Sequence, residues 1–592
     1  MVIPKGGIPR VAAQRRNPVT PAKSTSAHNY LFVFAEPRKV SNVPFFELQS
    51  LLRQHGDIKV MQEADFFEGM SYVFDGYVNS SQDPVANFPY INRGSAYLYP
   101  LEQSCIVSSD VEIDLFPVVA NSGYIHSAGK LVLAGRWDTM HLQDIKKVLE
   151  VEGRETSSMG LEFWTSTQPP DPGLEGLAID EKRYFISNLP FSSQASLLGQ
   201  ICAGRGDASK VTIFKDIHHD KGDTRYPESG DSVYMLAFTS QVRKFNPLHM
   251  LDEYKPYWKG IDTTPQALMA AMLNIACLRQ GGRFLDIFGG MGTSMIEATK
   301  VRPAQAVHND IMEIQGAKDN YDLLTRSPEE IRDLIRKLAS LKTTSRKHFE
   351  TLSEIARNSL DWADVGKERS YPRVLHVEDL EQRHPELKDF ANRIYFYMLR
   401  RGYYSEAHLS GREGLLGNVD KNLGLLNSYA VQLERALRQE SWNDNGVTFV
   451  ASFPKRGPWW ETRRMDMTHP LEDGESLPFN SLDGIVTDAP YGYGTDSDNR
   501  KLVQIYQNFI AASFDLLKPF GQLIFCVLDK VRTGKAVSTS LTTQGVTEMV
   551  QQIAAAKGTR FSYDGLEEPA HLMYWKSQKK LNRGIVRITV AK

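Results

Sequence analysis

The sequence predicts a multi-domain α/β protein whose C-terminal part is built around a mostly parallel, doubly wound sheet. Three observations predict this class. A chain of 592 residues is too long for one hydrophobic core. Apolar runs of strand length alternate with amphipathic helices through most of the chain. A short strand around residue 285 leads into a glycine-rich turn and a helix, which is how a βαβ unit begins.

The composition is that of a globular protein that works in water, with 41% hydrophobic and 24% charged residues. No uninterrupted apolar stretch approaches the roughly 18 residues that span a bilayer, so we expect no membrane association. The net charge of −2 requires that any nucleic-acid contact come from local patches. The cysteines lie far apart and form no Cys-x-x-Cys pair, which favours a reducing, cytoplasmic compartment and predicts no metal site.

Residues 1–28 contain several Lys and Arg residues and no acid. We expect a flexible, solvated tail in this segment. A nucleic-acid-binding arm and an organellar transit peptide are the alternatives.

Two small α/β units are expected before the C-terminal domain. The run YLFVFA at 30–35 predicts a strand, the apolar spacing of 44–56 predicts a helix, and 71–78 predicts a second strand. These elements open an N-terminal α/β domain at 29–166. A Pro/Gly-rich break then leads into a second compact unit at 167–250, where three strand candidates surround one apolar helix.

The C-terminal domain, 251–592, contains the segment RFLDIFGGMGTSMIEA. Asp286 ends its strand, and Gly289, Gly290 and Gly292 let the backbone turn sharply and approach a ligand closely. The first N–H groups of the following helix face that ligand. The turn lacks the Gly-Lys-Ser/Thr of a phosphate-binding loop, and a purely structural βα turn is the alternative interpretation.

A second acid, Asp310, ends the next strand. It follows Asp286 at about the 20-residue spacing at which doubly wound sheets place an acceptor for ribose hydroxyls. The ligand is therefore expected to carry a ribose without needing a pyrophosphate. S-adenosylmethionine fits, with its ribose at Asp310 and its charged amino-acid end near Asp286 and the glycine turn.

The motif Asp488-Ala489-Pro490-Tyr491 follows an apolar strand, at the edge of the sheet where ligands bind. An exocyclic amine of a nucleobase is a poor nucleophile because its lone pair is delocalised into the ring. The Asp488 carboxylate and the carbonyl of Ala489 or Pro490 can accept both amine hydrogens, which frees the lone pair for attack on a methyl sulfonium. Pro490 stiffens the loop, and Tyr491 offers a ring on which a flipped-out base can stack.

These motifs, LDIFGGMGTSMIEA, ND and TDAPYG in this order, resemble those of amino-methyltransferases with an Asp-Pro-Pro-Tyr signature. More closely, the chain resembles the catalytic subunits of tRNA guanosine-10 N2-methyltransferases. The segment NYLFVFAEPRKVSNVPFFELQSLLRQHG is similar to that family's first strand and helix. The segment from VYMLAFTSQVRKFNP to GGRFLDIFGG is similar to its passage into the catalytic domain.

The resemblance implies a Rossmann-like class I methyltransferase domain, preceded by an N-terminal domain and by a THUMP-like RNA-binding domain at 167–250. It implies S-adenosylmethionine as cofactor, tRNA or another structured RNA as substrate, and a small zinc-binding activator subunit as partner. Thr263, in GIDTTP, stands where the family has a Thr-Ser element beside the cofactor, and Asp466 is assigned to the acid after the third strand. The expected catalytic residues are Asp488, Ala489, Pro490 and Tyr491, and the expected cofactor-binding residues are Thr263, Asp286, Phe288, Gly289, Gly290, Gly292, Asp310 and Asp466.

The chain departs from the family at two places. Ala489 replaces the first proline of the signature, which keeps the acceptor carbonyl and removes some rigidity. The stretch 313–445 is charged and helical, and we interpret it as an insertion in the catalytic domain. Beyond it, Trp459 and Trp460 lie among arginines, a pattern that fits either base stacking on RNA or aromatic rings packed under the insertion.

We therefore expect an enzyme that methylates a nucleobase exocyclic amine, with N2 of guanosine in tRNA as the favoured target. Two alternatives remain. One is a DNA amino-methyltransferase acting on adenine N6 or cytosine N4. The other is a degenerate methyltransferase that serves as an RNA-binding or assembly scaffold, which the change at Ala489 favours.

Overall fold

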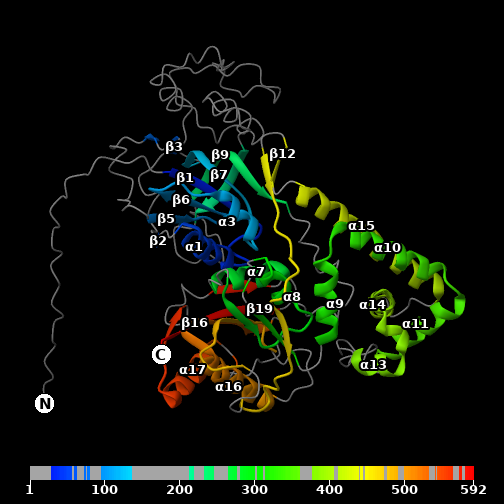
Figure 1. The fold of residues 1–592 in the computed structure, drawn as a ribbon. Coiled ribbons are helices and arrows are strands. Elements are labelled where there is room, and N and C mark those ends of the chain that lie inside the picture. Colours follow the sequence, from blue (N-terminus) through cyan, green and yellow to red (C-terminus); the bar gives the residue numbers. More distant parts are fainter. Residues whose placement is uncertain are drawn as a thin grey trace, which may run out of the picture.

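The computed structural model contains two sheets and a helical arm that extends to one side (Figure 1). The residues it describes are 28–56, 59–62, 72–74, 77–79, 95–136, 212–218, 232–245, 264–276, 281–300, 303, 305–310, 314–360, 377–405, 411–438, 441–444, 447–471, 477–490, 499–531, 541, 543–564, 573–576 and 581–591. Most of the basic tail, the Pro/Gly-rich break and the apolar helix expected after it lie outside these residues. Within these ranges, no helix is long and apolar enough to cross a membrane.

The first sheet is built mainly from the N-terminal part of the chain. Its main path runs β12-β13-β9-β7-β1-β6-β5-β2, with β3 attached to β7, β4 attached to β3 and β8 attached to β9. The helices α1 (Val43–Gly56) and α3 (Leu115–Asn121) pack against it through apolar side chains. The strands are β1 (His28–Phe34), β2 (Lys59–Gln62), β3 (Tyr72–Phe74), β4 (Tyr77–Asn79), β5 (Ser95–Pro100), β6 (Ser104–Ser109), β7 (Ile125–Arg136), β8 (Thr212–His218), β9 (Ser232–Lys244), β12 (Ser441–Asp444) and β13 (Val447–Val450).

Two features of this sheet differ from what the sequence predicted. The segment 71–78, expected as one strand, contributes to two strands, β3 and β4, which pair as an antiparallel hairpin. The Asp-Gly pair between them is a strong turn sequence, and the prediction overlooked it. The strand β13, far along the chain, pairs in parallel with β9, so a segment that follows the helical arm completes the N-terminal sheet.

The second sheet lies in the C-terminal part and has the order β14-β11-β10-β15-β16-β19-β17, with β18 also paired to β19. Its first five members in this order run parallel, and β19 is antiparallel to both of its neighbours on this path. This topology confirms the expected Rossmann-like fold. The strands are β10 (Arg283–Asp286), β11 (Gln305–Asn309), β14 (Trp460–Arg463), β15 (Leu482–Thr487), β16 (Leu517–Val531), β17 (Arg560–Asp564), β18 (Met573–Lys576) and β19 (Leu581–Ala591).

Helices cover both faces of the second sheet. Alternate side chains of its strands point to opposite faces, so Phe284 of β10 joins one apolar cluster and Leu285 joins the other. The helices α7 (Gln266–Ile275) and α8 (Thr293–Ala298) pack on the Phe284 face. The helices α16 (Asn499–Leu516) and α17 (Thr543–Lys557) pack on the Leu285 face. The near-continuous apolar strands of this domain follow from burial on both faces.

The expected helical insertion is present as an arm with an apolar core of its own (Figure 1). A capping box starts its second helix, because Ser327 and Glu330 each satisfy the backbone N–H of the other. Asp319 is fully buried in the arm and is paired with the guanidinium of Arg393 at 3.0 Å. The helices of the arm are α9 (Ile314–Leu324), α10 (Pro328–Thr343), α11 (Arg346–Asn358), α13 (Val377–Arg383), the 3-10 helix η4 (Pro385–Lys388), α14 (Phe390–Ser405) and α15 (Arg412–Arg438).

The two sheets are held together where α1 meets α7. The carboxylate of Glu47 on α1 is buried, and it accepts hydrogen bonds from the N–H groups of Gly123 and Tyr124 and from the amide of Asn274 on α7. The approach is close at Gly123, where a Cβ would lie 2.1 Å from the carbonyl oxygen of Ala267. A residue with a side chain does not fit there without moving α7.

Candidate functional site

The strands β10 and β15 are neighbours that end at the same edge of the second sheet. Phe284 and Leu285 of β10 are in register with Gly484 and Ile485 of β15. From β10 the chain continues to β11 on one side, whereas from β15 it continues to β16 on the other side. The loops after the two strands therefore diverge, and such a switch point is where doubly wound sheets hold their ligands.

The glycine turn after β10 has the tight geometry that its sequence predicted. Gly290 and Gly292 have positive φ angles of 49° and 81°, which residues with a side chain rarely adopt. Gly289 lies directly over His308 of β11, and a Cβ at Gly289 would lie 2.2 Å from Nδ1 of that ring. The N–H of Gly289 donates to the carbonyl of Asn309 at 2.8 Å. All three glycines are thus required by the backbone path.

Asp286 lies beneath this turn and is 1% exposed. One carboxylate oxygen accepts hydrogen bonds from the Thr487 hydroxyl at 2.6 Å and from the Phe288 N–H at 3.1 Å. The other accepts a hydrogen bond from the Ser294 hydroxyl of α8. Burial raises the pKa of Asp286 from 3.8 to about 7, against the opposing effect of these hydrogen bonds. In this position Asp286 fixes the shape of the turn from below.

Asp310 follows β11 and is half-buried at the same edge. Its Oδ2 accepts the N–H of Gly290 at 2.9 Å, so the second acid and the glycine turn are in direct contact. Next to it, the buried amide of Asn309 donates to the carbonyls of Ile287 and Met465. Asn309 thereby ties the ends of three strands together, a role that the sequence did not reveal.

Asp466 and Phe288 lie near the same edge. Asp466 comes three residues after β14, the strand that pairs with β11 on its outer side. Its side chain is exposed and accepts the N–H of Thr468 at 2.9 Å, and this hydrogen bond lowers its pKa. Phe288 is partly buried and packs edge-to-face against Phe509 of α16, with ring centroids 5.5 Å apart. Phe288 therefore anchors the turn to the helical layer.

Asp488 extends from the end of β15 into a buried polar cluster. Its side chain is 9% exposed, and Oδ2 lies 3.6 Å from the guanidinium of Arg583 on β19. The hydroxyl of Thr264, just before α7, donates a hydrogen bond to the same oxygen. Within the described residues, no N–H or O–H group donates to Oδ1. The motif thus has one restrained oxygen and one buried oxygen whose capacity to accept a hydrogen bond is unused among the residues that the structure describes.

The rest of the motif is described in part. Ala489 is fully buried and belongs to the apolar cluster that contains α16, and Pro490 is half-buried. Tyr491 and Thr263 lie outside the described residues. Thr264, which follows Thr263 in GIDTTP, contacts Asp488.

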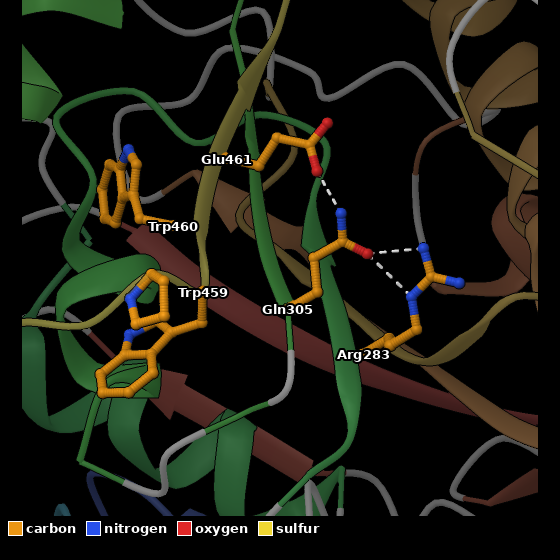
Figure 2. A pocket seen from close by; sticks show the side chains of 6 residues that line it. Arg283, Gln305, Trp459, Trp460 and Glu461 are labelled. Carbon is orange, nitrogen blue, oxygen red and sulfur yellow. Dashed lines mark hydrogen bonds between the residues drawn. The ribbon is translucent and has the colours of Figure 1, made fainter.

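A cavity opens at the opposite edge of the sheet, where β10, β11 and β14 begin (Figure 2). Arg283 donates to Gln305, which in turn donates to Glu461, so the polar wall of this cavity is internally hydrogen-bonded. Trp459 and Trp460 form its apolar side. Because the acids and the glycine turn lie at the other edge, we place the candidate site there and not in this cavity.

Known proteins give only distant likenesses. No protein-family model matches the chain, and no curated protein matches it. The structure of TrmN from Thermus thermophilus is 11% identical, with 95% of this chain and 100% of that chain covered and a TM-score of 0.32. The rRNA methyltransferase AviRa from Streptomyces viridochromogenes is 11% identical, with 56% and 86% covered and a TM-score of 0.24. TYW2 from P. horikoshii, solved with MeSAdo, is 9% identical, with 56% and 65% covered and a TM-score of 0.21. Likenesses this distant do not say what this chain binds or acts on.

Proposed function

We propose that this protein transfers a methyl group from S-adenosylmethionine to an exocyclic amine of an RNA base, with N2 of a guanosine in tRNA as the favoured target. The observation that carries this proposal is the position of Asp488 beside the glycine turn, at the switch point between β10 and β15. A carboxylate that accepts hydrogens, placed beside a cofactor turn, is what transfer to a weakly nucleophilic amine requires.

The residues around the turn fit this cofactor. Asp310 is half-buried at the end of the second strand, where a ribose would find its acceptor. Asp466 follows the third strand and is exposed, so its carboxylate is accessible to the adenine. Gly290 and Gly292 place no side chain above the turn. When bound, the cofactor supplies a methyl group carried on a positively charged sulfur.

The DAPY motif prepares the amine. Asp488 Oδ1 and the carbonyl oxygen of Ala489 accept one amine hydrogen each, which draws the nitrogen lone pair out of the ring and aims it at the methyl group. Asp488 takes up the proton that the amine loses. Pro490 restricts the loop, and Tyr491 stacks on the base, an interaction worth about 1–3 kcal/mol.

RNA binding is assigned to the N-terminal part. We place most of the RNA contact on residues 29–250, including the THUMP-like unit, because the chain there is similar to an RNA-binding family and has no catalytic motif. A small zinc-binding activator subunit completes the proposed assembly.

Mass spectrometry of nucleosides tests the proposal. Total tRNA is incubated with the protein and methyl-labelled cofactor, with and without a supplied activator subunit, and then digested. We expect labelled N2-methylguanosine. Label in N6-methyladenine or N4-methylcytosine of supplied DNA would support the DNA enzyme, and RNA binding without any label would support the scaffold.

A further inference from the structure

The two oxygens of the Asp488 carboxylate are in different environments. Oδ2 is contacted by both the Thr264 hydroxyl and the Arg583 guanidinium. Oδ1 is buried and receives no N–H or O–H hydrogen bond within the described part of the chain. A carboxylate held at one oxygen has a defined plane, so its second oxygen has a defined direction.

The two groups that hold Oδ2 come from segments far apart in the chain, one just before α7 and the other on β19. Thr264 is 9% exposed and precedes Pro265, the N-cap residue of α7. The helix α7 is packed between the two sheets. Arg583 is 5% exposed on β19, where it is in register with Leu528 of β16. A buried guanidinium is costly to keep unless a carboxylate faces it, and Asp488 supplies that charge. The contact is therefore part of the fold and not a surface ion pair.

Three protonatable groups near this pair are neutral. Burial, the negative charge of Asp488 and a hydrogen bond from the thiol to that carboxylate raise the pKa of the Cys526 thiol well above its ordinary value. Tyr506 is raised in pKa by burial and then by the charge of Asp488. Burial also raises the pKa of Tyr124, with the nearby positive charge of Arg583 opposing it. Since all three groups stay protonated at neutral pH, none of them adds a charge that competes for Arg583.

We propose that Thr264 and Arg583 are positioning residues that hold Asp488 by Oδ2, and that Oδ1 is the atom that accepts the hydrogen of the target amine. This inference rests on the proposed function. In the transfer step the amine nitrogen forms a bond to the methyl carbon while the carbon–sulfur bond breaks. Sulfur keeps the bonding pair and becomes neutral, and the nitrogen passes one proton to Oδ1.

Removing Arg583 should disturb the orientation of the Asp488 carboxylate. Without the guanidinium the carboxylate can rotate, and a misplacement of about 1 Å in a reacting group lowers rates by about a hundredfold. The cofactor does not contact Oδ2 in this scheme, so its affinity should not change. The maximal rate should fall while the KM values for cofactor and RNA stay nearly constant.

The test uses the full chain and single-turnover methyl transfer to tRNA at saturating cofactor. Arg583→Met should lower the rate roughly ten- to a hundredfold, and Arg583→Lys, which keeps a cation, should recover much of it. Thr264→Val should lower the rate roughly tenfold, whereas Thr264→Ser keeps the hydroxyl and should stay near the parent. Arg587→Met is the matched control, because Arg587 is half-buried on the same strand, in register with Ile524 of β16 and Asp564 of β17.

Calorimetric affinity for the cofactor and the unfolding midpoint are measured for every variant. Thr264→Val provides the test if Arg583→Met does not fold. Folded Arg583→Met and Thr264→Val proteins with the parent rate would overturn the inference and leave the proposed function intact. An increase in KM with an unchanged maximal rate would also overturn the inference. A parent that transfers no methyl group to any RNA would overturn the proposed function and this inference together.

Discussion

Thr487 donates a hydrogen bond to Asp286 at 2.6 Å, from the last residue of β15 to the last residue of β10. The same hydroxyl accepts the N–H of Phe288 at 3.0 Å. Because Thr487 directly precedes Asp488, one side chain joins the glycine turn to the DAPY motif. The two halves of the candidate site are therefore fixed relative to each other by a buried hydrogen bond at the switch point.

Thr487→Val should break this link with little change in volume. The variant removes two buried hydrogen bonds and leaves the Phe288 N–H and this Asp286 oxygen only their mutual contact at 3.1 Å, which should lower the free energy of unfolding by about 1–3 kcal/mol. Thr487→Ser keeps the hydroxyl and serves as the control. Urea unfolding of the three proteins measures the difference. Equal stability of the Val and Ser variants would mean that the hydrogen bond does not matter.

The buried acid beneath the turn predicts a pH dependence. The folded-state pKa of Asp286, about 7, exceeds its ordinary value of 3.8, so in the pH window between them the folded protein binds a proton that the unfolded chain has released. This group therefore lowers the stability of the fold as pH rises through the window, by at most about 1.4 kcal/mol per pH unit. Below the window the effect is absent, and above it the full cost is present.

Asp286→Asn removes this titration. Urea unfolding at several pH values between about 4 and about 7 should show the stability of the Asn variant rising relative to the parent as pH increases. A stability difference that does not change with pH would contradict the role of burial at this position.

Asp310 is predicted to hold the ribose of the cofactor. Asp310→Ala removes a charged acceptor and should lower cofactor affinity by about 1.5–3 kcal/mol, or roughly ten- to a hundredfold. Asp310→Asn keeps an acceptor oxygen for the Gly290 N–H but loses the charge, and should lose less affinity than the Ala variant. Isothermal titration calorimetry measures the cofactor affinity of both variants. Unchanged affinity in a folded Ala variant would refute this assignment.

The N-terminal 250 residues are predicted to carry most of the RNA affinity. Binding of tRNA to the full chain should weaken as salt rises, because phosphate contacts release counterions. A chain that starts near Leu251 should bind tRNA much more weakly and keep most of its cofactor affinity. Its folding is checked first by circular dichroism, since α7 loses α1 and β13 loses β9 in that chain. Undiminished tRNA binding by the folded fragment would contradict the prediction.

Local sequence patterns were sufficient to predict the frame of the site. An apolar run that ends in an acid predicted β10, β11 and β15, and the order of these runs along the chain placed Asp286, Asp310 and Asp488 at one edge. The strand β14 was missed because WETR, its sequence, has no apolar alternation and lies at the edge of the sheet. The pairing of β14 with β11 is what brings Asp466 toward this edge.

Contacts between distant segments were not predictable. Thr264 and Arg583 reach Asp488 from either side of it in the chain, and nothing near either residue marks it as a partner. The aromatic pair after the arm is a related case. Trp460 stacks on Tyr321, with ring centroids 4.4 Å apart, and lies parallel to His308. The neighbours of Trp460 therefore favour the interpretation that these aromatic rings pack under the insertion over the interpretation that they stack on RNA bases.

Variants in the DAPY motif test the proposed methyl transfer most directly. Single-turnover transfer of labelled methyl from S-adenosylmethionine to tRNA is measured for the parent, Asp488→Ala and Ala489→Pro, with an activator subunit supplied. The parent should yield N2-methylguanosine, and Asp488→Ala should bind the cofactor yet transfer nothing, because one of two acceptors for the amine is lost. Ala489→Pro keeps its carbonyl and restricts the loop, so its rate should equal or exceed that of the parent. A parent that transfers no methyl to any RNA, or an Asp488→Ala protein as active as the parent, would contradict the account.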